Sequence, residues 1–365
     1  MGQPILRHQV EKVKRACTVE DAMKQIQEKK VDIVSALPYY TVMNIRQTAK
    51  DIVNGKRLSK HDDLDFLITC DVQELCAAAD YIRKELCGDS VDLCTIINGK
   101  SGACSENCRF CTQSASCHSG CTVHSFLSVE KITAEAALNE REGAHRFSIV
   151  TSGRALGGKD FEQSLEAYRR MSKNHRIKLC ASMGLLTFEQ LVKLRAAGVT
   201  NYHCNLEASE RFFPSICTSH TFADKIRTIQ AAQKAGLAVC SGGIIGMGET
   251  WRDRIDMALT LADLNVVSIP VNILTAISGT PLQDLPPLEE EEVLRAVAIF
   301  RFINPAKDIR LAGGRRLLKH NGRAAFLSGA NAAITGNYLT TAGYTIAQDR
   351  VMLSELGRHV AENGA

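Results

Sequence analysis

The chain has 365 residues, of which 45% are hydrophobic and 23% are charged, as is usual for a globular protein. Its net charge of +4 comes from basic residues interleaved with acidic ones, which excludes the dense basic surface of a nucleic-acid-binding protein. No stretch approaches the ~20 apolar residues of a membrane span, and the amino terminus lacks the apolar core of a secretory signal. We therefore expect a cytoplasmic protein with no membrane and no nucleic acid as partner.

Fourteen cysteines are unusual for such a protein. In a reducing compartment, clustered cysteines indicate metal, iron–sulfur or thiol chemistry and not disulfides. Several of them are scattered among apolar neighbours, and we expect these to pack as small hydrophobic residues: Cys17, Cys70, Cys76, Cys87 and Cys94.

Residues 1–90 carry apolar residues at helical spacing, most clearly over 11–37 and 72–87. We interpret this segment as an N-terminal helical extension without a catalytic role. Residues 91–365 form the predicted catalytic domain.

From residue 91, short apolar runs alternate with amphipathic stretches. The runs predict eight strands, at 91–97, 145–152, 176–183, 199–207, 237–246, 266–274, 308–314 and 331–337. The stretches predict helices that include 129–141, 161–171, 187–198 and 222–236. Eight such units predict an α/β fold, a (β/α)8 TIM-type barrel with its chemistry at the carboxyl ends of the strands. A partial barrel of six units is the alternative, because the last two strands have the weakest patterns.

The most informative motif is Cys104-x3-Cys108-x2-Cys111, in the loop after the first predicted strand. Three thiolates can hold three irons of a four-iron cluster and leave the fourth iron without a protein ligand, whereas most electron-transfer clusters have four cysteines. A zinc site is the alternative, because Cys117 and Cys121 lie close by and could complete it.

This spacing, with an aromatic residue before the last cysteine, resembles the radical S-adenosylmethionine superfamily. The resemblance implies a [4Fe–4S] cluster on Cys104, Cys108 and Cys111 that binds S-adenosylmethionine and cleaves it to a 5′-deoxyadenosyl radical. It also implies that Phe110 lies beside the adenine.

Further pieces, from about residue 60 to the carboxyl terminus, resemble biotin synthase: INGKSGACSENCRFCTQS, YHCNLEAS, VCSGGIIGMGET, SIPVNILTAISGTPL, IRLAGGR and FLSGANAAITGNYLTT. The resemblance implies conversion of dethiobiotin to biotin by sulfur insertion, with an electron donor such as flavodoxin or ferredoxin and a homodimer. It excludes lipoyl synthase, which would need a second cysteine triplet near the amino terminus.

The same resemblance assigns roles to individual positions. Asn205 and Glu207 would bind the cofactor ribose, although the family has Asp at the second position. Lys225, where the family often has Arg, would bind the cofactor carboxylate. The remaining assignments are Thr151 and Ser152 near the methionine moiety, Ile244 near adenine, and Asn205 with Asn272 on the ureido ring of the substrate. Asn272 lies in an apolar run, where burial without a ligand would be costly.

Biotin synthases hold a second, [2Fe–2S] cluster with three cysteines and one arginine. Cys180, Cys240 and Arg310 match three of these positions, but Ser148 replaces the remaining cysteine, and a serine hydroxyl is a poor iron ligand. We therefore expect a different auxiliary iron–sulfur cluster on Cys180, Cys240 and Cys204, with Cys217 as a further candidate ligand. A four-iron cluster is one form that it could take. Strand alternation argues against Cys204 unless a bulge reverses its direction.

Two other functions stay open at this point. One is a relative of biotin synthase that acts on another substrate, as an amino-acid mutase or a metallocofactor maturase. The other is a non-catalytic iron–sulfur or zinc protein.

Overall fold

The computed structural model describes residues 44–336 and 343–361. Its parallel strands are β1 (Ser90–Lys100), β2 (Arg146–Thr151), β3 (Lys178–Ser182), β4 (Asn201–His203), β5 (Ala238–Cys240), β6 (Gly243–Ile245), β7 (Ser268–Ile273), β8 (Asp308–Leu311), β9 (Ala332–Ile334) and β10 (His359–Val360). The sheet closes because β9 pairs with β1, and β10 extends β1 at its start. The predicted barrel is confirmed, and the six-unit alternative is excluded.

One predicted strand, 237–246, is divided into β5 and β6 at Ser241 and Gly242. A Cβ atom on Gly242 would lie 2.0 Å from the carbonyl oxygen of Pro270 in β7. Only glycine allows the two backbones to approach so closely.

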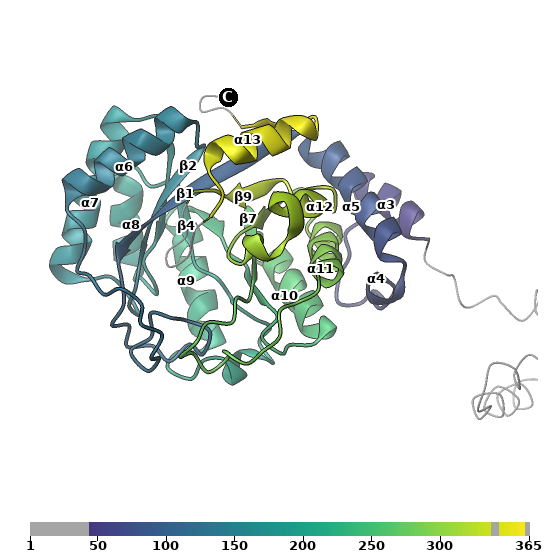
Figure 1. Cartoon of the computed structure of the whole chain (residues 1–365), viewed down its shortest axis with the longest axis horizontal. Coiled ribbons are helices and arrows are strands. Elements are labelled where there is room, and N and C mark those ends of the chain that lie inside the picture. Colours follow the sequence, from purple (N-terminus) through teal and green to yellow (C-terminus); the bar gives the residue numbers. More distant parts are fainter. Residues whose placement is uncertain (1–43, 337–342, 362–365) are drawn as a thin grey trace, which may run out of the picture. The chain divides into compact units, whose positions relative to one another are not determined.

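Helices lie on the outside of the strands (Figure 1). They are α6 (Val129–Glu142), α7 (Gly158–Asn174), α8 (Phe188–Ala196), α9 (Phe222–Lys234), α10 (Trp251–Asp263), α11 (Glu290–Ile303), α12 (Arg323–Phe326) and α13 (Ile346–Glu355), with the 3-10 turns η1 (Phe213–Ser215), η2 (Arg315–Leu317) and η3 (Lys319–Gly322). Capping boxes fix where several of them begin, because a threonine side chain accepts the free N–H of the first turn at Thr187, Thr221, Thr250 and Thr345. None of the helices in the described residues combines the length and the apolar character needed to cross a membrane.

The described residues from 45 onward form one compact unit. It begins with α3 (Ile45–Val53), α4 (Phe66–Thr69) and α5 (Val72–Cys87), and α5 packs against α11. The predicted helix over 72–87 is confirmed, whereas the one over 11–37 lies outside the described residues. The domain boundary at residue 90 stays a prediction.

Strand alternation directs every second side chain into the barrel. On β2, Phe147 and Ile149 are fully buried in the core between strands and helices, while Ser148 between them faces the interior. This division between a packed outer core and a polar interior creates the space for the site.

Candidate active site

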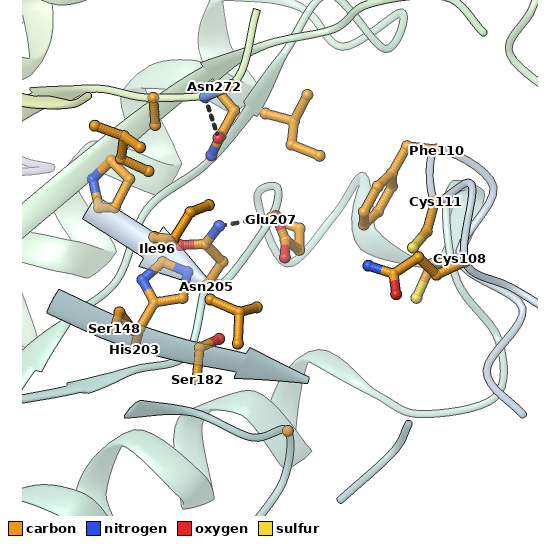
Figure 2. A pocket seen from close by; sticks show the side chains of 18 of the residues that line it. Ile96, Cys108, Phe110, Cys111, Ser148, Ser182, His203, Asn205, Glu207 and Asn272 are labelled. Atoms are coloured by element: carbon orange, nitrogen blue, oxygen red, sulfur yellow. Dashed lines mark hydrogen bonds between the residues drawn. The ribbon is translucent and has the colours of Figure 1, made fainter. Parts of the chain in front are cut away.

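A cavity of about 470 Å3 occupies the barrel interior. Its lining includes most of the predicted site residues: Cys104, Cys108, Phe110, Cys111, Ser148, Thr151, Ser152, Cys180, Asn205, Glu207, Lys225, Cys240, Ile244, Asn272 and Arg310. Figure 2 shows Cys108, Phe110 and Cys111 on one side of this cavity and Ser148 and His203 on the other. The barrel therefore gathers residues that are up to 206 positions apart in the chain (Cys104 to Arg310).

The cysteine triplet lies in a loop at the mouth of the barrel. This loop is closed by backbone hydrogen bonds from Cys104 N to the Gln113 carbonyl (3.0 Å) and from Ala115 N to the Cys104 carbonyl (2.8 Å). The three thiols are half-buried, and burial raises the pKa of Cys111 to about 11. A metal cation reverses that preference, since it binds the deprotonated thiolate. Three soft donors on one half-buried loop fit an iron–sulfur cluster.

Ser152 connects the end of β2 to this loop, because its hydroxyl donates to the Gly102 carbonyl at 2.8 Å. Beside it, the buried Thr151 hydroxyl has no hydrogen-bond partner within the described part of the chain. An unpaired buried hydroxyl in a cavity wall fits a polar ligand that supplies the missing bond.

Glu207 has a left-handed backbone with φ of 72°, which costs about 1–2 kcal/mol in a non-glycine residue. Backbone hydrogen bonds on both sides hold it there, from Glu207 N to the Gly242 carbonyl and from Ile244 N to the Glu207 carbonyl. Burial raises the pKa of its carboxyl group, and the charge of Lys225 opposes that rise. Strain at one acidic residue facing a cavity is typical of a ligand-binding position.

Asn205 and Asn272 already have protein partners. The Asn205 side chain accepts from Gly242 N and donates to the Glu207 carboxylate at 3.3 Å (Figure 2). Asn272 accepts from Gly313 N at 2.9 Å and donates to the Gly243 carbonyl at 3.1 Å. Asn272 is only partly buried and pairs with the backbone, so burial alone does not require a ligand there. Each amide nevertheless keeps one N–H and one oxygen lone pair for a ligand.

Phe110 and Ile244, predicted to enclose adenine, pack against the same small apolar cluster, which contains Ala208, Ile216, Met247, Leu274 and Leu282. Two segments distant in sequence thus form one apolar wall near the triplet.

The inner end of the cavity contains a cysteine that the sequence analysis misassigned. Cys94 on β1 lines the cavity with Cys180 and Cys240, and its thiol donates to the Thr95 carbonyl at 3.6 Å. The proximity of the two thiols lowers the pKa of Cys180 and raises that of Cys94. In the strand register, Ile96 is opposite Ser148, so Cys94 lies two residues earlier on the same face. The prediction that Cys94 only fills the hydrophobic core is wrong.

Two guanidinium groups flank these thiols. Arg310 donates to Asp92 Oδ1 (2.7 Å), Ser268 Oγ (3.2 Å) and two backbone carbonyls. Arg146 donates to the other oxygen of Asp92 at 2.7 Å. Burial by itself would raise the pKa of Asp92, but the two arginines and His145 hold it well below its usual value. The Arg310 nitrogens already donate to these partners. The guanidinium group therefore lies beside the cysteines as a fixed positive charge.

Cys204 and Cys217 do not join the inner cysteines. Cys204 is 5% exposed, packs in the outer hydrophobic core and is not in the cavity lining, because β4 has no bulge that would turn it inward. Cys217 lies at the opposite end, with its sulfur 3.7 Å from that of Cys108. The structure therefore does not bring Cys204 and Cys217 together with Cys180 and Cys240, whereas Cys94 lies with them.

His203, which no sequence pattern singled out, is half-buried and lines the cavity beside Asn205 (Figure 2). Period-two alternation with Asn205 and Glu207 was the signal that could have identified it. The same alternation in the first predicted strand was the signal for Cys94.

Comparisons with known proteins agree with this geometry. Residues 100–261 match the radical SAM superfamily model, and residues 270–359 match the biotin and thiamin synthesis associated domain. The barrel is similar in fold to methylornithine synthase (18% identity, TM-score 0.74, covering 87% of this chain and 98% of that one). It is also similar to HydG, a maturase of the [FeFe]-hydrogenase (17% identity, TM-score 0.71, covering 98% and 79%).

Curated relatives are far more similar in sequence. Biotin synthase of Alkaliphilus metalliredigens is 53% identical over 87% of this chain and 100% of its own length. Biotin synthase of Clostridium beijerinckii is 53% identical over 86% and 99%. Identity of this extent excludes a non-catalytic iron–sulfur or zinc protein. The chain belongs to the biotin synthase family of radical SAM sulfurtransferases.

Proposed function

We propose that this chain inserts sulfur into dethiobiotin to form biotin, with two iron–sulfur clusters at opposite ends of one cavity. The observation that supports this is the arrangement of its cysteines, since one set of three lines the mouth and another lines the inner end. When bound at the mouth, the cluster and S-adenosylmethionine supply a radical that can remove hydrogen from unactivated carbon, which no side-chain base can do. The barrel wall holds the substrate between the two sets of cysteines.

At the mouth, Cys104, Cys108 and Cys111 would hold the [4Fe–4S] cluster. Glu207 and Asn205 would accept and donate hydrogen bonds at the cofactor ribose, and Lys225 would pair with the cofactor carboxylate. Ser152 and the unpaired hydroxyl of Thr151 would bind the methionine moiety, and Phe110 and Ile244 would enclose the adenine. Burial of these groups excludes water from a reactive radical.

In the middle of the cavity, the amides of Asn205 and Asn272 would bind the ureido ring of dethiobiotin. Their backbone partners fix the direction of each amide before the substrate arrives. Such preorganisation reduces the entropy lost on binding.

At the inner end, Cys94, Cys180 and Cys240 would hold the auxiliary cluster that donates sulfur. Ser148 lies beside Cys180 in the register but offers no thiol, and Cys94 on the neighbouring strand supplies one instead. Arg310 and Arg146 would neutralise the thiolates from outside. Three thiolates without a fourth ligand match the donor set at the mouth, which favours a four-iron auxiliary cluster.

Iron content tests the auxiliary site. After anaerobic reconstitution we expect about eight irons per chain, whereas a two-iron auxiliary cluster would give about six and its absence about four. Loss of Cys94 should remove only the auxiliary iron.

Anaerobic turnover tests the reaction. With dithionite, S-adenosylmethionine and dethiobiotin, the iron-loaded chain should form both 5′-deoxyadenosine and biotin. If deoxyadenosine forms but biotin does not, whichever electron donor is used, dethiobiotin is not the substrate. That result would favour a relative of biotin synthase that acts on another substrate. We further propose a cytoplasmic location, together with a flavodoxin or ferredoxin as electron donor and a homodimer, the last two of which follow from the family resemblance alone.

A further inference from the structure

A second group of metal-ligand side chains surrounds one cysteine of the triplet. The ligand atoms of Cys108, Cys217 and His220 all lie within 4.8 Å of one another. The two sulfurs are 3.7 Å apart, and the Cys217 sulfur is 3.4 Å from His220 Nδ1 and 3.8 Å from Nε2. Neither Cys217 nor His220 has a role in the proposed sulfur insertion.

These separations fit one tetrahedral ion. With zinc–sulfur bonds of about 2.3 Å and zinc–nitrogen bonds of about 2.0 Å, tetrahedral angles place two sulfurs ~3.8 Å apart and a sulfur and a nitrogen ~3.5 Å apart. The atoms are therefore close to the separations that a mononuclear site requires. Two thiols and one imidazole leave the fourth position for a water or a further ligand.

The histidine makes the carboxylate contact that a metal-binding histidine usually makes. Its Nδ1 is 2.5 Å from Glu106 Oε2, so Nδ1–H donates to the carboxylate and Nε2 keeps its lone pair. A carboxylate on the distal nitrogen fixes the tautomer and the ring direction of zinc-bound histidines. Glu106 also accepts from Ser219 Oγ at 2.8 Å, and the Phe213 ring contacts the imidazole edge-on with centroids 5.6 Å apart.

The two loops that carry the ligands are joined to each other. Arg109 N donates to the Ile216 carbonyl at 2.9 Å, and Asn107 Oδ1 accepts from Thr218 N and Ser219 N, both at 3.0 Å. Cys217 and His220 are only 4% and 7% exposed. The ligands are thus held in place by the fold and not only by the ion.

We propose that Cys108, Cys217 and His220 bind a single thiophilic divalent cation of the Zn2+ or Fe2+ class when the triplet carries no cluster. Binding converts both thiols to thiolates and releases their two protons. Because Cys108 belongs to both sets, the single ion and the triplet cluster exclude each other. This exclusion rests on the proposed function, whereas the binding of the ion does not.

Cobalt(II) is a suitable probe, since it occupies the same kind of site as zinc and thiolate ligation gives it strong near-ultraviolet absorption. The reduced, cluster-free, full-length chain is titrated anaerobically, and bound cobalt is counted. Cys217→Ser and His220→Ala should each lose one equivalent of tightly bound cobalt, while a Cys104→Ser/Cys111→Ser double variant should keep it. Cys204→Ser, a buried cysteine outside the cavity, is the matched control and should bind as the wild type does.

The opposite pattern would overturn the proposal. If cobalt binding is lost in the Cys104→Ser/Cys111→Ser variant but not in Cys217→Ser or His220→Ala, the ion occupies the cluster triplet. If the wild type binds no more cobalt than Cys217→Ser, the site does not exist. Circular dichroism of each variant shows that a loss is not unfolding.

Two more measurements complete the test. Glu106→Gln should weaken cobalt binding by roughly 10-fold or more, because it removes the carboxylate that orients His220. Reconstitution of the wild type with iron and sulfide should abolish the equivalent of cobalt that depends on Cys217. Deoxyadenosine formation by the same reconstituted sample reports on the proposed function separately, so either idea can fail alone.

Discussion

Cys94 on β1 and Cys180 on β3 line the same cavity, on either side of the β2 residue Ser148. The two cysteines are 86 positions apart in the chain, and the pairing of β2 with both β1 and β3 brings them together. The inner end of the cavity thus has three thiols, although Ser148 stands where the family resemblance implies a cysteine.

Replacement of Cys94 should separate the two clusters. We expect Cys94→Ala to hold about four irons per chain instead of about eight, because only the triplet remains complete. It should still cleave S-adenosylmethionine but form no biotin. Iron analysis and product quantification by mass spectrometry check this, with Cys204→Ser as the control that keeps both. Full iron content in Cys94→Ala would show that Cys94 is not a ligand.

Asp92 should be essential for stability, because it bridges the guanidinium groups of Arg310 and Arg146 in the interior. Asp92→Asn leaves two buried positive charges without their countercharge, which should cost about 3–5 kcal/mol in the free energy of unfolding. Urea denaturation measures the loss. Asp89→Asn, at a half-exposed ion pair with Arg83, should cost no more than about 1 kcal/mol. Equal losses in the two variants would contradict the assigned role.

Asp253 should make stability depend on pH in the acid range. It is 1% exposed, and although burial opposes ionisation, hydrogen bonds from Ser209, Thr250 and Arg211 lower its pKa to about 2. Since the folded pKa lies below the unfolded value, the contribution is complete above pH ~4 and is lost as pH falls towards 2. Asp253→Asn should therefore be less stable by on the order of 2 kcal/mol at pH 7.

That difference should shrink when unfolding is measured at pH 3 and below. The exposed Asp263 of the same helix provides the control, because Asp263→Asn should follow the wild-type stability at each pH. If the difference in the free energy of unfolding between the wild type and Asp253→Asn stays constant down to pH 2, the carboxylate charge of Asp253 is not what stabilises the fold.

Gly242 should tolerate no side chain. A Cβ atom there would lie 2.0 Å from the Pro270 carbonyl oxygen, so Gly242→Ala must separate β7 from the segment that holds Asn205 and Glu207. We expect a loss of several kcal/mol in stability and weaker S-adenosylmethionine binding. Gly157→Ala, where the added atom meets nothing within 4 Å, is the control. Wild-type stability in Gly242→Ala would disprove the close approach.

Much of the fold could be predicted from sequence because its signals are local. The strand at 145–152 and the helix at 72–87 follow from apolar spacing and caps, and the structure has β2 and α5 there. The division of 237–246 into β5 and β6 could not be predicted, because it depends on the distance between Gly242 and a strand distant in sequence.

The candidate site divides in the same way. Motif spacing identified Cys104 and the rest of the triplet, whereas the environment of Cys94 depends on which strands become neighbours when the barrel closes. Asn272 shows the converse, since its apolar run predicted a side chain without protein partners but the Gly313 and Gly243 backbones pair with it. Partners supplied by other strands are not visible in any one segment.

The central claim is that sulfur bound at Cys94, Cys180 and Cys240 enters biotin, and isotope transfer tests it most directly. The chain is reconstituted anaerobically with iron and sulfide enriched in a heavy sulfur isotope, freed of excess sulfide, and allowed a single turnover with S-adenosylmethionine, dithionite and dethiobiotin. The account predicts biotin carrying the heavy isotope from the wild type and none from Cys94→Ala, while both release 5′-deoxyadenosine. Heavy biotin from Cys94→Ala in the wild-type amount, or unlabelled biotin from the wild type, would contradict it.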